Sequence, residues 1–180
     1  APTHLPTECT YDRECAAPQN QFKLTGSNFS GWKCTGGGES CNGNIIAAGD
    51  SLKNATATDG ATITLTAQWG TNTFKVKYSG GTGATGNAPS SPTTCTYGGD
   101  CKAPTNTYSK TGYTFANWKC TSGCTSEQTF NAGDSISTAT NTNNGEITLT
   151  AQWTANTFTI KFNDLIILIN KIINYITGEE

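Results

Sequence analysis

The sequence contains one pattern twice. Residues 61–78 read ATITLTAQWGTNTFKVKY, and residues 145–162 read GEITLTAQWTANTFTIKF, at an offset of 84 positions. Three further pairs of segments correspond in the same order: CTYDREC (9–15) with CTYGGDC (95–101), TGSNFSGWKC (25–34) with TGYTFANWKC (111–120), and AAGDS (47–51) with NAGDS (131–135). A repeat of this length is a small domain rather than one turn of a solenoid. The 180 residues are therefore expected to form two small domains in tandem.

One strand-like segment of the repeat is lacking at the start of the first unit and is present in an extra copy after the second. The second unit opens with a strand-like segment, NTFKVKY at 72–78, whereas the first unit has PTHLPTEC at 2–9 in that place. A further copy of the segment, NTFTIKF at 156–162, follows the second unit. The chain is accordingly divided into a first repeat that lacks its N-terminal strand (1–69), a complete second repeat (70–153), and a surplus strand with a tail (154–180).

Eight cysteines, four in each unit, indicate how such small domains are stabilised. A domain of this size buries only about 60% of its unfolded surface, so its apolar core alone is marginal. Zinc is disfavoured because the sole histidine, His4, lies outside the repeated segments. Disulfides imply a secreted or cell-surface protein. We expect all eight to be disulfide-bonded: Cys9, Cys15, Cys34, Cys41, Cys95, Cys101, Cys120 and Cys124.

The pairing is expected to be local. CTYGGDC is typical of a tight hairpin, because its two glycines permit positive φ, and this places Cys95 opposite Cys101. The loop after the tryptophan would be closed similarly by Cys34–Cys41 and Cys120–Cys124. Four cysteines permit three connectivities, so the other pairings stay open.

Composition excludes several partners. The net charge is −2, and only 13% of the residues are charged, without clusters, which gives no electrostatic basis for binding nucleic acid or an anionic membrane surface. The absence of methionine indicates a processed form or a fragment of a longer chain. Asn28 and Asn54 stand in N-glycosylation acceptor sequences.

Alternating apolar and polar residues predict strands at 73–78, 111–118 and 146–153. These segments also carry a family resemblance: the combination GYTFxxWK, NAGDSI, ITLTAQW and NTFxIKF resembles the Listeria–Bacteroides repeat, also known as the internalin-type B repeat, over nearly all of residues 1–162. The resemblance implies β-grasp-like modules in tandem, which serve bacterial surface and secreted proteins as stalks, spacers and adhesive contacts rather than as catalysts. The chain departs from the family in its cysteines and, from residue 163, in its tail.

The tail, NDLIILINKIINYITGEE, places apolar residues on one stripe and asparagines on the other at helical spacing. A helix of about 14 residues is too short for a membrane span, and its β-branched residues keep a strand as the alternative. The expected fold class is mainly β, with β-grasp-like modules in tandem, disulfides and a C-terminal hydrophobic helix or strand.

The missing strand and the surplus strand together predict a joint between molecules. A neighbouring copy could donate residues 155–162 to the open sheet of the first unit, with residues 163–180 packing beside it, which would give a head-to-tail homopolymer. The residues expected to join subunits are Phe158, Ile160, Phe162, Leu165, Ile166, Leu168, Ile169, Ile172, Ile173 and Ile176. The alternative is a fragment of a longer monomeric tandem array, in which the phase of the ends has no meaning.

No set of residues indicates catalysis, and no cofactor or metal is expected. Asp50 and Asp134 recur as turn residues, and the lone His4 lies in the N-terminal segment outside the repeated units, which argues against a histidine-based nucleophile system. The recurring aromatic residues are typical of a core, although they could instead form a sugar-stacking platform: Trp32, Trp69, Trp118, Trp153, Phe29 and Phe115. An adhesin module that binds host or cell-surface glycans or proteins is therefore the alternative to a structural stalk or filament.

Overall fold

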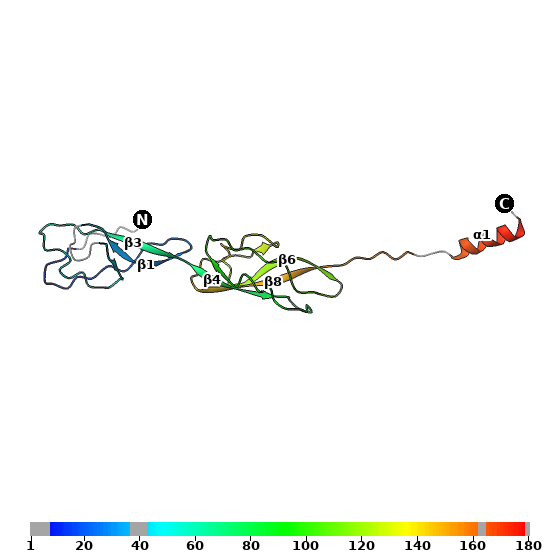
Figure 1. The fold of residues 1–180 in the computed structure, drawn as a ribbon, viewed down its shortest axis with the longest axis horizontal. Coiled ribbons are helices and arrows are strands. Elements are labelled where there is room, and N and C mark those ends of the chain that lie inside the picture. The colour runs from blue at the N-terminus through cyan, green and yellow to red at the C-terminus, as the bar shows by residue number, and fades with distance from the viewer. Residues whose placement is uncertain (1–7, 37–42, 162–164, 179–180) are drawn as a thin grey trace.

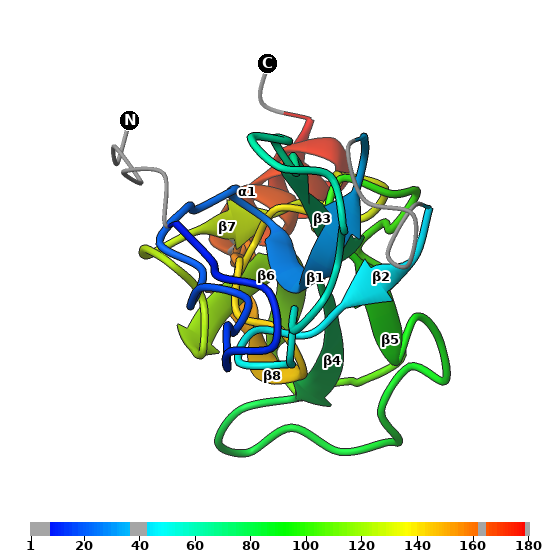
Figure 2. The same ribbon diagram turned by 90° about the vertical axis from the view of Figure 1, so that its left-hand side faces the viewer.

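The computed structural model describes residues 8–36, 43–161 and 165–178. The first unit contains a three-stranded antiparallel sheet in the order β2-β1-β3. Its strands are β1 (Ser27–Cys34), β2 (Ile45–Ile46) and β3 (Leu65–Thr71). In Figure 1 this unit lies at one end of the molecule, and Figure 2 shows its strands in front of the second unit.

The second unit contains a five-stranded sheet in the order β5-β4-β8-β6-β7. Its strands are β4 (Thr73–Ser79), β5 (Thr94–Thr96), β6 (Tyr113–Ser122), β7 (Thr129–Phe130) and β8 (Gly145–Ala155). The central pair β4–β8 is parallel and the other pairs are antiparallel. The expected strands correspond to β4, β6 and β8, and the mainly β fold class is confirmed. The β-grasp arrangement stays a prediction.

The sheet of the first unit reproduces three of these five strands. β1, β2 and β3 correspond to β6, β7 and β8, with an offset of 86 residues up to Cys34 and of 84 from β2 onward. The pairing register is also repeated, because Phe29 lies opposite Trp69 as Phe115 lies opposite Trp153, each followed by a bulge. The first unit has no counterparts of β4 and β5 among its described residues.

The core of the second unit lies on one face of its sheet. Inward-facing residues from β4, β6 and β8 alternate with outward-facing polar ones, as the sequence period of two requires. The side chains of Trp118, Ile147 and Leu149 are fully buried, and Ile136 reaches the same cluster from the loop before β8. The core of the first unit is smaller and centres on Cys34 and Ala55.

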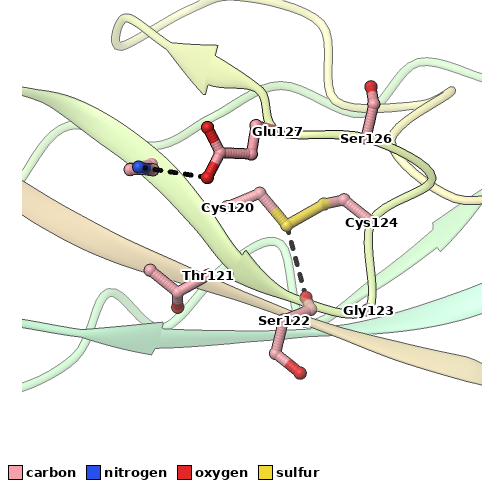
Figure 3. Close-up of a pocket in the computed structure, with 8 residues that line it drawn as sticks. Cys120, Thr121, Ser122, Gly123, Cys124, Ser126 and Glu127 are labelled. Carbon is pink, nitrogen blue, oxygen red and sulfur yellow. Dashed lines mark hydrogen bonds and ion pairs between the residues drawn. A yellow bond between two sulfur atoms is a disulfide. The ribbon is translucent and has the colours of Figure 1, made fainter.

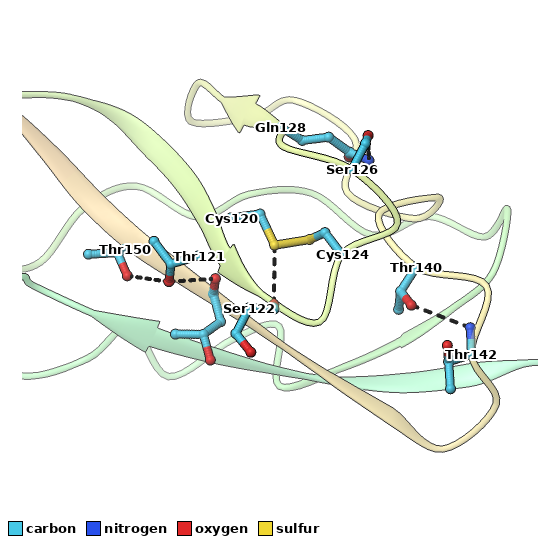
Figure 4. Close-up of a disulfide and its surroundings, with 10 residues drawn as sticks. Cys120, Thr121, Ser122, Cys124, Ser126, Gln128, Thr140, Thr142 and Thr150 are labelled. Atoms are coloured by element: carbon cyan, nitrogen blue, oxygen red, sulfur yellow. Dashed lines mark hydrogen bonds between the residues drawn. A yellow bond between two sulfur atoms is a disulfide. The ribbon is translucent and has the colours of Figure 1, made fainter.

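Three disulfides are described, and all are local, as expected: Cys9–Cys15, Cys95–Cys101 and Cys120–Cys124. Figure 4 shows the last one joining the end of β6 to the loop before β7. Cys34 is also disulfide-bonded, but Cys41 lies outside the described residues, as does His4. In the second unit these bonds tie loops to β5 and β6, whereas Cys9–Cys15 closes a loop outside the sheet of the first unit.

The tail is a helix, α1 (Leu165–Thr177), which decides between the two expected conformations. It ends before Gly178, whose φ of 70° and backbone N–H hydrogen bond to the carbonyl of Asn174 (2.9 Å) form a left-handed cap. None of the described helices is long and apolar enough to span a membrane.

Candidate functional site: an open strand position and an unused strand

In the second unit, β4 fills the position between β5 and β8. Its parallel register pairs Phe74 with Gly145, Val76 with Ile147 and Tyr78 with Leu149. Phe74 and Val76 are only 1% and 4% exposed, because both side chains point into the core. This strand therefore closes one side of the hydrophobic cluster and also completes the hydrogen bonding of β8.

The same position is open in the first unit. β3 pairs with β1 on one side, and no described residue pairs with its other edge. Residues 61–64, the counterparts of the first residues of β8, are not in a strand, although their sequence alternates in the same way. Residues 61–64 are not a strand because they have no partner strand, whereas residues 145–148 of β8 pair with β4.

Without this strand the core of the first unit is partly uncovered. Ile63 and Leu65 are half-buried, whereas their counterparts Ile147 and Leu149 are 0% exposed. Cys9 is likewise exposed, whereas Cys95 is buried beside β4. An exposed strand edge above an open apolar cluster is a site where another strand can add.

Trp69 lies beside the same open position, and its counterpart in the second unit makes a hydrogen bond there. In the second unit the indole N–H of Trp153 donates a hydrogen bond to the carbonyl of Gly80, directly after β4 (2.8 Å). The corresponding Trp69 is half-buried, and its indole donates to no residue in the described part of the chain. The open position thus includes an unused donor as well as apolar surface.

The turn that precedes β3 already has the geometry that receives a strand. In the second unit, Asn144 at φ 55° donates its backbone N–H to the carbonyl of Thr73 on β4 (2.7 Å). The counterpart Gly60 has a φ of 70°, and the next residue, Ala61, closes the turn by bonding to Thr58 (3.3 Å). The first unit therefore already has the turn in which the backbone N–H of Gly60 could donate to an added strand.

The segment predicted as a surplus strand is not a strand in its described part, residues 156–161, but it has side chains that would fit the open position. Phe158 and Ile160, the counterparts of Phe74 and Val76, are 85% and 64% exposed. Figure 1 shows this segment running away from the second unit. Among the described residues after β8, only Asn156 is held, because it donates its backbone N–H to the carbonyl of Gly112 (2.9 Å) and accepts from the hydroxyl of Thr114 (2.6 Å).

The tail also presents uncovered apolar side chains. Ile169, Ile172, Ile173 and Ile176 are between 47% and 76% exposed, so no described residue of the second unit covers them. The remaining residues expected to join subunits are Phe162, Leu165, Ile166 and Leu168. Phe162 lies outside the described residues, and so do the side chains of the other three.

The junction between the units is made by Asn72, which sequence reasoning did not single out. Its backbone N–H donates to the carbonyl of Gly26 in the first unit (2.9 Å), and its carbonyl accepts from Tyr97 in the second (2.8 Å). Its side-chain nitrogen donates to the carbonyl of Asn141 (2.6 Å). The signal was present in the recurrence of Asn before Thr-Phe at 72 and 156, and of Thr-Gly at 25–26 and 111–112.

The aromatic residues are mainly core. Trp32 and Trp118 are 2% and 0% exposed, and their indoles donate to the carbonyls of Pro18 (2.8 Å) and Pro104 (2.9 Å). Trp69 and Trp153 are half-buried, and each meets a phenylalanine edge to face. The core interpretation therefore holds for the first pair, and the second pair retains some accessible surface.

Two shallow hollows were considered as binding sites. One, of about 420 Å³, surrounds the Cys120–Cys124 disulfide, and Figure 3 shows that its charged groups are Glu127 and the lysine paired with it, Lys119 (3.5 Å). The other, of about 400 Å³, lies beside Phe29 and Trp69 at the junction. No hydrogen bond between a hydroxyl and a carboxylate is described among the residues that line either hollow, and the described residues contain no group of three potential metal ligands.

The expected glycosylation sites differ in accessibility. Asn28 is exposed on β1. Asn54 is half-buried, and its side-chain nitrogen donates to the carboxylate of Asp12 (2.8 Å) while its oxygen accepts the backbone N–H of the same residue (2.6 Å). A glycan on Asn54 would therefore replace a contact that holds the loop between Cys9 and Cys15, and both sites stay predictions.

Comparison with known proteins places the repeat. A protein of Evansella cellulosilytica, whose name describes it as a Gly-rich membrane protein, is 30% identical over 156 residues. The match covers 81% of this chain but 16% of that relative, so the chain spans a small part of its length. No solved structure matches. Residues 71–152 match the Listeria-Bacteroides repeat domain, a structural repeat associated with bacterial surface proteins, and this segment, the second unit, is therefore a repeat of that family.

Proposed function

We propose that the chain is an extracellular structural repeat protein that forms a surface stalk or filament by joining to further copies of itself. One copy donates residues 155–162 to the open edge of β3 in the next copy, and its tail, residues 163–180, packs against that copy. The observation that carries the proposal is the difference between the two units. β8 has β4 beside it, whereas among the described residues β3 has an open edge, and residues 156–161, whose sequence matches β4, lie exposed outside any strand.

The internal repeat supplies the register of the joint. By the offset of 84, Phe158 of the donor would lie opposite Ala61 of the acceptor, Ile160 opposite Ile63, and Phe162 opposite Leu65. On its other side the donated strand would run antiparallel to the residues around Cys9, as β4 does to those around Cys95. Because Phe158, Ile160 and Phe162 alternate with polar residues, all three side chains would enter the acceptor core.

Burial of Phe158 and Ile160 would contribute about 3–6 kcal/mol. This is close to the lower estimates for the entropy lost when two proteins associate, about 4 kcal/mol. The strand alone is therefore expected to bind weakly, and the apolar face of α1 would supply further affinity. Donor and acceptor surfaces are different, so the contact continues from copy to copy.

Sedimentation velocity of two point variants tests this proposal. Ile160→Asp places a charge on the side chain that would be buried, whereas Thr159→Asp places the same charge on the opposite face, where the counterpart Lys75 is exposed. Neither change should disturb the free chain, because Ile160 is exposed there. The wild type and Thr159→Asp should associate with rising concentration and Ile160→Asp should not. A wild type that sediments as a monomer at all concentrations would refute the proposal and favour a longer array, in which a preceding repeat supplies the strand.

A second candidate function is glycan binding at the hollow beside Phe29 and Trp69. The two rings meet edge to face, with centroids 5.9 Å apart, and Lys23, Asn141 and Thr142 supply polar groups around them. Trp69 fluorescence should then change and saturate when a suitable glycan is added. A lack of change across a panel of cell-surface glycans would leave the structural function alone.

A further inference from the structure

At the junction between the units, the ring of Tyr97 packs on the backbone of Gly26. The φ of Gly26 is 72°, and a Cβ at this position would overlap the ring of Tyr97. Tyr97 also donates its backbone N–H to Asn72. The junction therefore combines a strand continuation at Asn72 with a tyrosine ring seated on a glycine.

The end of the second unit that lies away from the first unit has an equivalent glycine. Gly112 has a φ of 79°, and its carbonyl accepts from Asn156 at 2.9 Å, the same distance as between Gly26 and Asn72. A Cβ at Gly112, however, would meet no atom within 4 Å. The surface on which a tyrosine sits at Gly26 is thus bare at Gly112.

The first unit carries the other partner of such a contact, a tyrosine, in its N-terminal loop. Tyr11 corresponds to Tyr97 by the offset of 86, lies in the same position between two disulfide-bonded cysteines, and is 56% exposed. The loop that carries it is held by the Cys9–Cys15 disulfide and by two hydrogen bonds between Asp12 and Asn54. Tyr11 is therefore presented on an ordered loop without a glycine beneath it.

We propose that Tyr11 of one copy packs on Gly112 of the copy that donates its strand, so that the joint between molecules reproduces the junction within the molecule. This inference rests on the proposed strand donation and adds a second, separate contact to it. Asn156 of the donor would take the place of Asn72: its carbonyl would accept from the backbone N–H of Tyr11, and its side-chain nitrogen would donate to the carbonyl of Ala57, the counterpart of Asn141.

The consequence is a filament in which all units are spaced alike. With strand donation alone, the two copies would be linked only through the donated segment and the hydrogen bonds of Asn156 to Gly112 and Thr114. A ring seated on the glycine backbone fixes the orientation, as it does between the two units of one chain. Tyrosine contacts of this kind often dominate the affinity of an interface.

Gly112→Asn tests the contact, since asparagine tolerates positive φ and its side chain would occupy the place of the Tyr11 ring. Gly133→Asn is the matched control, because Gly133 has a φ of 92°, an added Cβ there would also meet no atom within 4 Å, and the residue lies outside the joint. We expect Gly112→Asn to weaken self-association about 10- to 30-fold in sedimentation equilibrium, and the control to leave it unchanged. Tyr11→Ala should weaken it similarly.

A labelled peptide of residues 155–162 separates this contact from strand donation, because the peptide contains no Gly112. The peptide should bind the Gly112→Asn chain as tightly as it binds the Gly133→Asn chain. If the peptide binds but Gly112→Asn associates as tightly as the wild type, the Tyr11 contact is refuted and strand donation stands. If neither the peptide binds nor the wild type associates, both proposals are refuted.

Discussion

Leu149 and Leu65 occupy equivalent positions in the two units, and truncating each to alanine measures how far β4 closes a core. Leu149 is 0% exposed and lies between Tyr78 on β4 and Cys120 on β6. Leu65 pairs with Cys34 on β1, has no described partner on its other side and is half-buried.

The two substitutions should therefore differ in cost. Leu149→Ala would leave a closed cavity in the second unit and is expected to lower its free energy of unfolding by about 2–5 kcal/mol. Leu65→Ala removes a side chain that water already reaches, so the expected loss in the first unit is about 1 kcal/mol.

Hydrogen exchange followed by mass spectrometry at increasing urea is the suitable assay, because peptides from each unit report separately. The background should be Ile160→Asp, which keeps the edge of β3 free. Thr150→Ala and Thr66→Ala serve as controls, since each removes one hydroxyl contact to a threonine: Thr121 on β6 (2.9 Å) and Thr35 directly after β1 (3.3 Å). Equal losses for the two leucine variants would refute the inference that the first unit lacks part of its core cover. In the self-associating wild-type background, the cost of Leu65→Ala should rise toward that of Leu149→Ala.

The contacts within the second unit and the exposed tail give three further predictions. Burial raises the pKa of Tyr78 above its ordinary value of 10.0, so the folded second unit favours the neutral phenol. The contribution of Tyr78 to the free energy of unfolding should therefore be constant below about pH 10 and fall above it by up to about 1.4 kcal/mol per pH unit. Urea unfolding at pH 9 and pH 11 would show this difference. Replacing Cys95 and Cys101 together by serine opens a short loop and should lower the stability of the second unit by about 2 kcal/mol in the same assay, and no change would mean that the disulfide does not restrict the unfolded chain. Removing residues 163–180 should weaken self-association without changing the hydrogen exchange of either unit, whereas slower association with altered exchange in β8 would indicate that the tail stabilises its own unit instead.

The strands and the local disulfides could be predicted because their signals are local. Alternation in TFKVKY and EITLTAQW states which face is buried, and cysteines six positions apart around a turn can meet only if the turn is tight. The helix at 165–177 stayed ambiguous because its isoleucines suit either a strand or an amphipathic helix.

The partners of these elements could not be predicted in the same way. The parallel pairing of β4 with β8 joins residues about 70 positions apart, and a pattern of period two does not name a partner. Asn72 looks like a linker residue in the sequence, yet it is buried and bonded to Asn141, 69 positions away. Its importance becomes visible only when the two units are placed around it.

The open position on β3 was inferred from the phase of the repeat, and the structure shows which groups lie there: half-buried Ile63 and Leu65, and the indole N–H of Trp69, which donates to no other described residue. We propose that this position receives residues 155–162 of another copy. Solid-state NMR on an equimolar mixture of two samples, one with ¹³C-labelled isoleucine methyls and one labelled with ¹⁵N, detects contacts between copies. We expect contacts from the Ile160 methyl of one copy to backbone nitrogens of residues 62–64 in another. Contacts confined to single copies, with Ile160 still exposed to water, would contradict it.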